Sequence, residues 1–569
     1  MLKQLTCYAA LSLLLISCSG SDDNLSHLKA VGGAHYGGEF RFMSPEHISS
    51  LLPCEAGDVY SQRVTCQLFD PILNLDPSGK RVIPSIAESY EVSEDARTIT
   101  LKIRNGIFFH DDECFDGAGR ELTAEDVKFT LDFACSGLPE NQMAYLLIDR
   151  VKGAKEFNET SKKTLPANGV SGIKAADKST VVISLVEPCA NIDKILTMTA
   201  FGVFPKEAYD HYGKDLHNHP VGTGAFTLAE NTKNHLLLKR NPNYWRKDEF
   251  GNQLPFLGSI IITFADKKRD ELVAFRKSKI DLVLEIPADD VDEVLGTLAE
   301  AQAGKTVKHK VDALASSSIQ FVGIQHQNPV LKDVRVRKAL AMAIDKRHLV
   351  DVDLKGDGYV AEHGVIPDAE FFQASKVKGN KFDVAAAQSL LASAGHPGGA
   401  GVPELKLYVN GAIDSDKDRV AKAVARDLGQ NLGLIVKVIN VSRAEAEKAI
   451  LNGSADLWIS GWIADYPDAE NFLALFRGIA PSMKTSAVNP FNYNSTQFDS
   501  YFTMASKELN AAKRMELLIK ADQQLMDDAA VIPILTEDFI TMTNSRIRNF
   551  EPNSLEILNF SNIFIKELK

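Results

Sequence analysis

Asp456-Leu-Trp-Ile-Ser-Gly-Trp-Ile-Ala-Asp-Tyr-Pro-Asp-Ala-Glu-Asn-Phe-Leu473 is the most informative stretch of this chain of 569 residues. Residues 457–463 are mostly apolar and predict a short strand, and the Asp-Tyr-Pro-Asp sequence after it predicts a turn, because proline fixes one φ angle. Trp462 and Asp465 would then lie at the end of the strand, where an aromatic face and a carboxylate suit an organic cation. A buried strand followed by a solvated turn explains the same residues without any ligand.

The same stretch resembles the Gly-Trp-x-x-Asp-Tyr-Pro-Asp-x-x-Asn-Phe segment of the family 5 extracellular solute-binding proteins, which include the oligopeptide- and dipeptide-binding components of ABC importers. Two other segments, Pro220-Val-Gly-Thr-Gly and Arg240-Asn-Pro-Asn-Tyr-Trp245, also resemble the family. The resemblance extends over nearly the whole mature chain, in the expected order, through residues 67–73, 93–129, 220–245, 332–345, 390–395 and 528–550. On these segments the chain is identified as a member of the family.

The resemblance implies an α/β fold of the periplasmic-binding-protein type. Two lobes are joined by two hinge strands, the first lobe carries an extra subdomain, and the ligand is enclosed at the hinge. By matching segments we expect a signal peptide at 1–17, a lipid-anchored flexible tether at 18–35, a first lobe at 36–318 and 537–569 with a subdomain at about 57–187, and a second lobe at 319–536.

The implied function is that of a substrate-binding protein of an ABC importer, which captures a peptide-like solute and delivers it to the permease by closing its lobes. Other members of the family bind nickel complexes, haem, opines or sugars, so a non-peptide solute stays an alternative, as does a sensory receptor with the same fold. An exported hydrolase is a further alternative. The sequence contains no Gly-x-Ser-x-Gly elbow and no His-Glu-x-x-His helix, so we expect no enzyme activity.

The resemblance also implies where the ligand binds. Asp465 matches the aspartate that pairs with the α-ammonium group of the ligand in peptide-binding relatives, and Trp462 aligns with an aromatic residue of the same pocket. Ile463 stands where some oligopeptide binders have a disulfide-forming cysteine. The expected ligand-binding residues are Gly461, Trp462, Ile463 and Asp465 in the second lobe, and Leu52, Pro53 and Cys54 in the first, where family members present backbone to the ligand.

The N-terminus predicts export. Lys3 supplies a positive charge, residues 9–16 form a short apolar run, and Leu15-Ile16-Ser17-Cys18 resembles a lipobox. The apolar run is too short to span a bilayer as a stable helix. The resemblance implies cleavage before Cys18 and lipid attachment to its sulfur, which would anchor the protein to a membrane of the cell envelope. A plain secretory signal with an incidental cysteine is the alternative.

Five further cysteines follow the predicted anchor. An exported protein permits disulfides, and local pairing predicts bonds between Cys54 and Cys66 and between Cys114 and Cys135, with Cys189 reduced. The sequence leaves other pairings open. No Cys-x-x-Cys or Cys/His spacing typical of a metal site occurs, and we expect neither a metal nor a cofactor.

Charge and length limit the partners. The chain has 63 basic and 75 acidic residues, a net charge of −12 that is spread along it, which argues against nucleic-acid binding. Its length predicts more than one lobe. The expected partners are a peptide or other small-molecule ligand, the permease subunits of an ABC transporter and, through Cys18, a membrane. We expect a monomer.

Periodicity and capping predict several elements. Strict alternation over residues 98–103 predicts a half-buried strand. Thr123, followed by acidic residues, predicts the N-cap of a helix. Residues 418–431 and 514–526 are expected to be helical within an α/β arrangement of short strands and helices.

Overall fold

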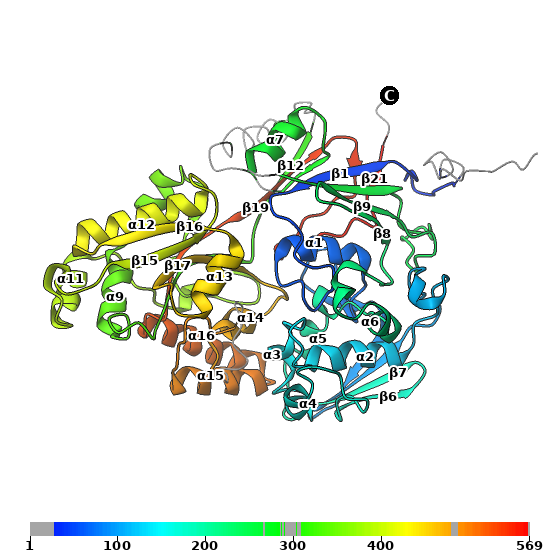
Figure 1. The fold of residues 1–569 in the computed structure, drawn as a ribbon, viewed down its shortest axis with the longest axis horizontal. Helices are drawn as coiled ribbons and strands as arrows, with labels where there is room; N and C mark the ends of the chain where they lie inside the picture. Colours follow the sequence, from blue (N-terminus) through cyan, green and yellow to red (C-terminus); the bar gives the residue numbers. More distant parts are fainter. Residues whose placement is uncertain are drawn as a thin grey trace, which may run out of the picture.

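The computed structural model has two lobes that lie side by side (Figure 1). The predicted signal peptide and Cys18 lie outside the residues that it describes. No helix in the described part of the chain is both long and apolar enough to cross a membrane. The structure describes residues 25, 28–265, 268–284, 286, 290, 303, 309–478 and 488–566.

The first lobe is built on a mixed sheet of seven strands. β1 is parallel to its neighbours β10 and β11, and the other pairs are antiparallel. The side chains of Phe40 and Phe42 on β1 point to one face, as the two-residue period of a strand requires, and both are buried. The strands, in spatial order, are β12 (His309–Ala315), β19 (Asp538–Asn544), β11 (Leu282–Val283), β1 (Glu39–Ser44), β10 (Ser259–Phe264), β9 (His235–Arg240) and β8 (Phe226–Asn231).

A second, antiparallel sheet of four strands belongs to the same lobe. The strand predicted at residues 98–103 is β5, with Ile99 and Leu101 buried in the core to which helix α2 (Ala124–Cys135) also contributes. Thr123 is the N-cap of α2, as predicted, and its backbone N–H donates to Asp126 Oδ2 over 2.8 Å. The spatial order is β4 (Ala87–Val92), β5 (Thr98–Ile103), β7 (Thr180–Ser184) and β6 (Ile173–Asp177).

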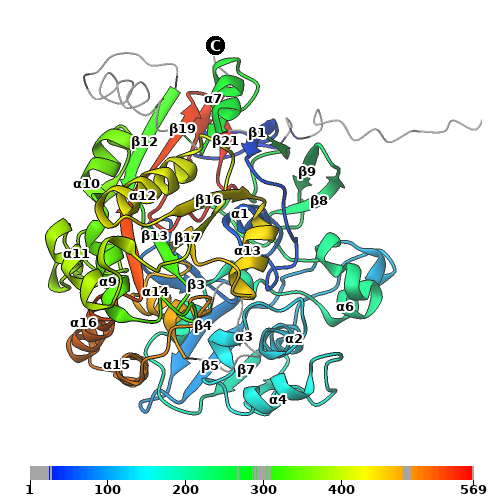
Figure 2. The same ribbon diagram turned by 60° about the vertical axis from the view of Figure 1, so that its left-hand side comes forward.

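The second lobe is built on a sheet of six strands and the helices between them (Figure 2). On one face of the sheet, Val322 and Leu457 pack with helices α9 (Val334–Ala343), α11 (Val384–Ser393) and α12 (Asp416–Leu432). The predicted strand at 457–463 is β17, with the same bounds. The spatial order is β14 (Tyr359–Val360), β18 (Val531–Thr536), β13 (Ser318–Ile324), β17 (Leu457–Ile463), β15 (Leu405–Asn410) and β16 (Val436–Val441).

Two adjacent connections join the lobes. The chain passes from β12 to β13 through Ser316 and Ser317, and it returns from β18 to β19 through Glu537. Ser316 N donates to Glu537 O over 3.1 Å, and Gln320 Nε2 donates to Glu537 Oε1 over 2.8 Å. Because the two connections run together, a change in a few dihedral angles there can rotate one lobe against the other.

Shorter helices complete the lobes. Both views place α14 of the second lobe beside α3 of the first, away from the connections (Figures 1 and 2). The helix predicted at 514–526 is confirmed as α16. The remaining helices are α1 (Val59–Leu68), α3 (Ala144–Leu147), α4 (Ala154–Thr160), α5 (Ile192–Ile195), α6 (Lys206–Tyr212) and α7 (Lys268–Arg276) in the first lobe, and α10 (Lys346–His348), α13 (Arg443–Leu451), α14 (Glu470–Leu473), α15 (Thr496–Lys507) and α16 (Ala511–Asp527) in the second.

The predicted disulfides differ from the structure, in which Cys54, Cys66, Cys114, Cys135 and Cys189 all carry free thiols. The thiol of Cys66 donates to the carbonyl of Leu558 over 3.0 Å, whereas Cys54 is buried in the turn before α1. Cys114 lies in a surface turn, whereas Cys135 is buried at the end of α2. Proximity in the sequence therefore does not bring either pair of sulfur atoms together.

Candidate functional site

A cavity of about 810 Å³ lies between the two lobes. This volume is within the range of about 300–1,000 Å³ that is typical of sites for small organic ligands. The first lobe contributes the start of α1 and of β19, and the second contributes β13, the end of β17, and the starts of α12 and α13. Both lobes thus provide walls, so a ligand bound here contacts both.

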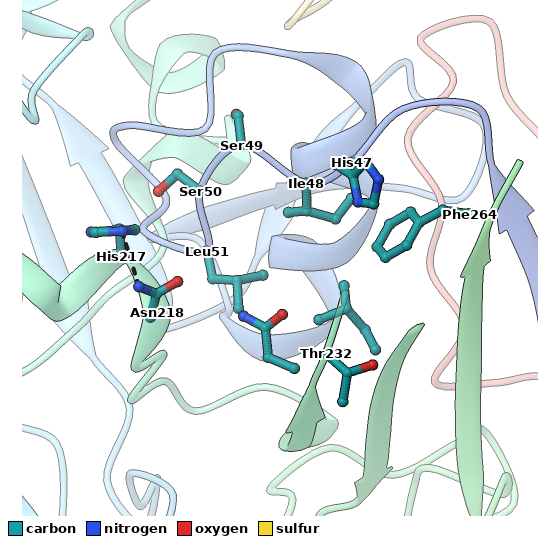
Figure 3. A pocket seen from close by; sticks show the side chains of 11 residues that line it. His47, Ile48, Ser49, Ser50, Leu51, His217, Asn218, Thr232 and Phe264 are labelled. Atoms are coloured by element: carbon teal, nitrogen blue, oxygen red, sulfur yellow. Dashed lines mark hydrogen bonds between the residues drawn. The ribbon is translucent and has the colours of Figure 1, made fainter. Parts of the chain in front are cut away.

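A much smaller pocket of about 70 Å³ lies wholly within the first lobe (Figure 3). His47 and His217 lie on opposite sides of it, and the ring of His47 packs 4.3 Å from that of Phe264. His217 Nε2 lies 3.0 Å from Asn218 Nδ2. A pocket of this volume holds a few water molecules at most, so the cavity between the lobes is the candidate site.

One edge of β17 is open where it reaches this cavity. β13 pairs with β17 along its whole length, from Ile324–Leu457 to Ser318–Ile463. On the other edge, β15 pairs only as far as Val409–Ile459. Residues 460–463 all line the cavity. Among the described residues, no strand covers this edge, so its backbone N–H and C=O groups are available to an extended chain.

Asp465 lies just beyond that open edge. It lines the cavity and is half-buried. Its carboxylate accepts two long hydrogen bonds, from Asn471 Nδ2 at 3.3 Å and from Gln62 Nε2 at 3.5 Å. Burial raises the pKa of Asp465 to about 6, although these hydrogen bonds act to lower it. Within the described part of the chain, Asp465 forms no ion pair, so an incoming cation finds a carboxylate without a counter-charge.

Asn471 fixes the geometry of this end of the cavity. Its Oδ1 accepts from the indole Nε1 of Trp462 over 2.7 Å and from the backbone N–H of Asp465 over 3.1 Å. One side-chain amide therefore orients both the aromatic ring and the carboxylate. We did not predict this role, although Asn471 lies in the stretch that the sequence singled out.

The first lobe reaches Asp465 through α1. Asp58 is the N-cap of this helix, and its Oδ1 accepts from Ser61 N over 2.8 Å. Gln62, one residue further, then faces the second lobe and donates to Asp465. No sequence signal marks Gln62, because its partner is 403 residues away.

The predicted residues fall into two groups. Gly461, Trp462, Ile463 and Asp465 all line the cavity. The prediction for Leu52, Pro53 and Cys54 is not supported, because these residues are buried and are not among those lining the cavity. The backbone turns here, with Ala56 N donating to Leu52 O over 3.0 Å, and this turn packs into the core of the first lobe. Residues 57–60 and 62–63 line the cavity in their place.

The rest of the cavity combines apolar and charged walls. Phe321, Leu475 and Phe491 line it near the centre of the second lobe. At its rim, Arg443 donates to Glu447 over 3.0 Å and lies 3.9 Å from Glu46 of the other lobe. A cavity that combines apolar walls with polar groups is typical of sites for small organic ligands.

Comparisons of the sequence with known proteins find relatives among solute-binding proteins. The model of the family described as "Bacterial extracellular solute-binding proteins, family 5 Middle" matches residues 81–484. The chain is 26% identical to the periplasmic oligopeptide-binding protein OppA of Escherichia coli K12, over 86% of this chain and 85% of that protein. It is 24% identical to di/tripeptide-binding protein 1 of Pseudomonas aeruginosa UCBPP-PA14, over 88% of each chain.

Solved structures share the fold. The periplasmic binding protein DppA of Helicobacter pylori, in complex with the peptide STSA, superposes with a TM-score of 0.79 at 19% identity, covering 94% of this chain and 99% of that one. The binding protein AgaA of A. tumefacien R10, in complex with agropinic acid, gives a TM-score of 0.78 at 18% identity, with coverage of 94% and 99%. The two-lobe α/β fold is therefore shared with proteins that hold different solutes.

Proposed function

The chain belongs to the bacterial extracellular solute-binding proteins of family 5, and from this premise we propose that it is the substrate-binding protein of an ABC importer that captures peptides. One observation carries the choice of peptide: an open strand edge, residues 460–463, leads to a carboxylate without a basic partner among the described residues. Members of this family are binding proteins, and the proposed function includes no chemical change of the ligand.

The backbone and the terminal ammonium group of a peptide each have a counterpart in the cavity. Its backbone pairs with the edge of β17 as an added strand, which gives affinity without depending on side chains. Its terminal ammonium group lies against Asp465 and the ring of Trp462. Gly461 leaves the backbone exposed at this edge, and a Cβ atom there would lie 2.9 Å from the carbonyl oxygen of Ile319.

The proposal extends to the movement of the lobes and to the location of the protein in the cell. We propose a first lobe at 36–318 and 537–569, with a subdomain at about 57–187, and a second lobe at 319–536 that closes on the ligand by bending at the paired connections. The exported protein presents its closed form to the permease, attached to a membrane through a lipid on Cys18. A Cys18→Ser variant should remain precursor-sized and lose its membrane attachment.

Binding and recovery of defined ligands test the proposal. Purified protein is incubated with a mixture of peptides that have free N-termini, and bound molecules are identified by native mass spectrometry. We expect one unchanged peptide per protein. Binding of a nickel complex, haem, an opine or an oligosaccharide in place of every peptide would reject the peptide assignment, and hydrolysed peptide would reject a pure binding role.

A further inference from the structure

The two lobes also meet at a second place, away from the hinge connections. Arg150 follows α3 of the first lobe, and its Nη2 donates to Glu470 Oε1 of the second lobe over 2.8 Å. Asn191, which precedes α5 of the first lobe, donates through Nδ2 to Glu470 Oε2 over 2.7 Å. Tyr466 OH, from the same lobe as Glu470, donates to Oε2 over 3.0 Å. Glu470 therefore takes two of these three hydrogen bonds from the opposite lobe.

This contact is almost free of solvent. The side chain of Glu470 is 1% exposed and that of Arg150 is 11% exposed. Burial alone would lower the pKa of Arg150, but the charges and hydrogen bonds around it, those of Glu470 foremost, together outweigh burial and raise it. Arg150 therefore stays charged at neutral pH, and Glu470 is the acidic group with which it pairs.

A second ion pair supports the same contact. Lys194 Nζ of the first lobe donates to Asp468 Oδ2 over 3.0 Å and to the carbonyl of Pro467 over 3.0 Å. Asp468 also receives two hydrogen bonds from Arg514 of its own lobe, at 2.8 and 2.7 Å. If the lobes separated, Asp468 would keep Arg514, whereas Glu470 would keep only Tyr466 among the hydrogen-bond partners named here.

The contact lies outside the ligand cavity. Arg150, Asn191 and Glu470 are not among the residues that line it. Glu470 nevertheless immediately precedes Asn471, which orients Trp462 and Asp465. A ligand thus does not touch this contact, but separation of the lobes must break it.

We propose that Arg150, Asn191 and Glu470 form a closure latch: by joining the lobes opposite the hinge, they favour the closed form and slow the release of whatever the cavity holds. Separation breaks two hydrogen bonds to the Glu470 carboxylate, one of them part of an ion pair, and charge-assisted bonds of this kind are among the strongest in proteins, which makes opening infrequent. Because the latch makes no contact with ligand, its effect is the same for ligands with and without a free amine.

Glu470→Gln, which removes the charge while keeping the shape, tests this role. Its matched control is Glu370→Gln, at an exposed pair between lobes in which Glu370 lies 2.5 Å from Lys80, with side chains 71% and 51% exposed. Small-angle X-ray scattering of the ligand-free variants measures the open fraction. Stopped-flow dissociation of a fluorescent tripeptide, with a free or an acetylated N-terminus, measures release.

We expect Glu470→Gln to increase the radius of gyration of the ligand-free protein and to speed release of both peptides about tenfold or more, with Glu370→Gln within about twofold of wild type. The release readout rests on the proposed function, whereas scattering without ligand does not, so failure of peptide binding and failure of the latch are distinguishable. The latch would be overturned if Glu470→Gln and Glu370→Gln gave the same radius of gyration without ligand. It would also be overturned if Glu470→Gln sped the release of only the peptide with a free amine.

If Glu470→Gln does not fold, Asn191→Ala decides through the same two measurements, because it removes one hydrogen bond between the lobes and strands no charge. The double variant Arg150→Met with Glu470→Gln should change release by less than the product of the two single effects, since the second substitution removes a partner that is already lost.

Discussion

Three carboxylates within six residues of the second lobe, those of Asp465, Asp468 and Glu470, differ in their partners. Asp468 and Glu470 are buried, and each forms an ion pair with a basic residue of the opposite lobe; Asp468 also pairs with Arg514 of its own lobe. Asp465 also faces the opposite lobe, but its described side-chain partners are the amides of Gln62 and Asn471. The same turn therefore contains carboxylates that hold the protein together and one whose charge is left for a ligand.

The difference shows in the direction of the pKa shifts. Burial would raise the pKa of Asp468, but Arg514 and Lys194 outweigh it and hold the pKa below its usual range. Burial raises the pKa of Asp465 to about 6, because amide hydrogen bonds alone do not offset desolvation. A ligand ammonium group would supply the charge that Arg514 and Lys194 supply to Asp468.

The largest effect is expected for Asp468, which has two basic partners. Arg514→Ala removes two hydrogen bonds from Asp468 and leaves its buried charge with Lys194 alone. We expect the free energy of unfolding to fall by about 3–5 kcal/mol, as measured by denaturant titration. Arg335→Ala is the control, because its partner Asp333 is 32% exposed and such pairs contribute about 0–1 kcal/mol. Equal losses in both variants would show that Asp468 does not depend on its partner.

Asp465, which has no basic partner among the described residues, predicts that the affinity for peptide depends on pH. With a pKa of about 6, Asp465 is mostly protonated at about pH 5 and mostly ionised at about pH 7, while the α-ammonium of a peptide stays charged at both. Since the ammonium binds the ionised form, affinity should rise about tenfold over this range. It should fall again above about pH 8, where the α-amino group of the peptide loses its proton. Titration calorimetry at several pH values measures it, and a flat profile would show that Asp465 carries no such charge change. The pKa of neighbouring Tyr145 is raised by burial, so this group does not titrate in the window.

A smaller effect is expected from Asn471, which follows Glu470 in the sequence and donates a hydrogen bond to Asp465. Asn471→Ala removes a hydrogen bond that stabilises ionised Asp465, so the pKa of Asp465 should rise and the pH midpoint of binding should move upward. At neutral pH we expect affinity for a peptide with a free amine to fall about three- to tenfold, the value of one typical hydrogen bond. An unshifted midpoint would contradict the positioning role of Asn471.

The sequence predicted local elements better than contacts between distant segments. The apolar run at 457–463 and the alternation at 98–103 are strands with those bounds, because a short apolar run and a two-residue period are both local signals of a strand. Helix α12 begins two residues before the prediction, since Ser415 provides its cap. The partners of Glu470 could not be predicted, because Arg150 lies 320 residues away and no local pattern encodes that pairing. Leu52, Pro53 and Cys54 do not line the cavity, because the burial of their backbone is set by tertiary packing, which no local pattern encodes.

The central claim is that Asp465 binds the terminal amine of a peptide. The most direct test combines Asp465→Asn with N-acetylation of the ligand in a double cycle measured by calorimetry. Truncating one partner of a desolvated charge pair typically costs about 2–5 kcal/mol, so Asp465→Asn should weaken binding of the free peptide by about 30-fold or more. Acetylation should cost the wild type a similar factor and the variant much less. Equal losses on acetylation in both proteins would show that Asp465 does not hold the amine.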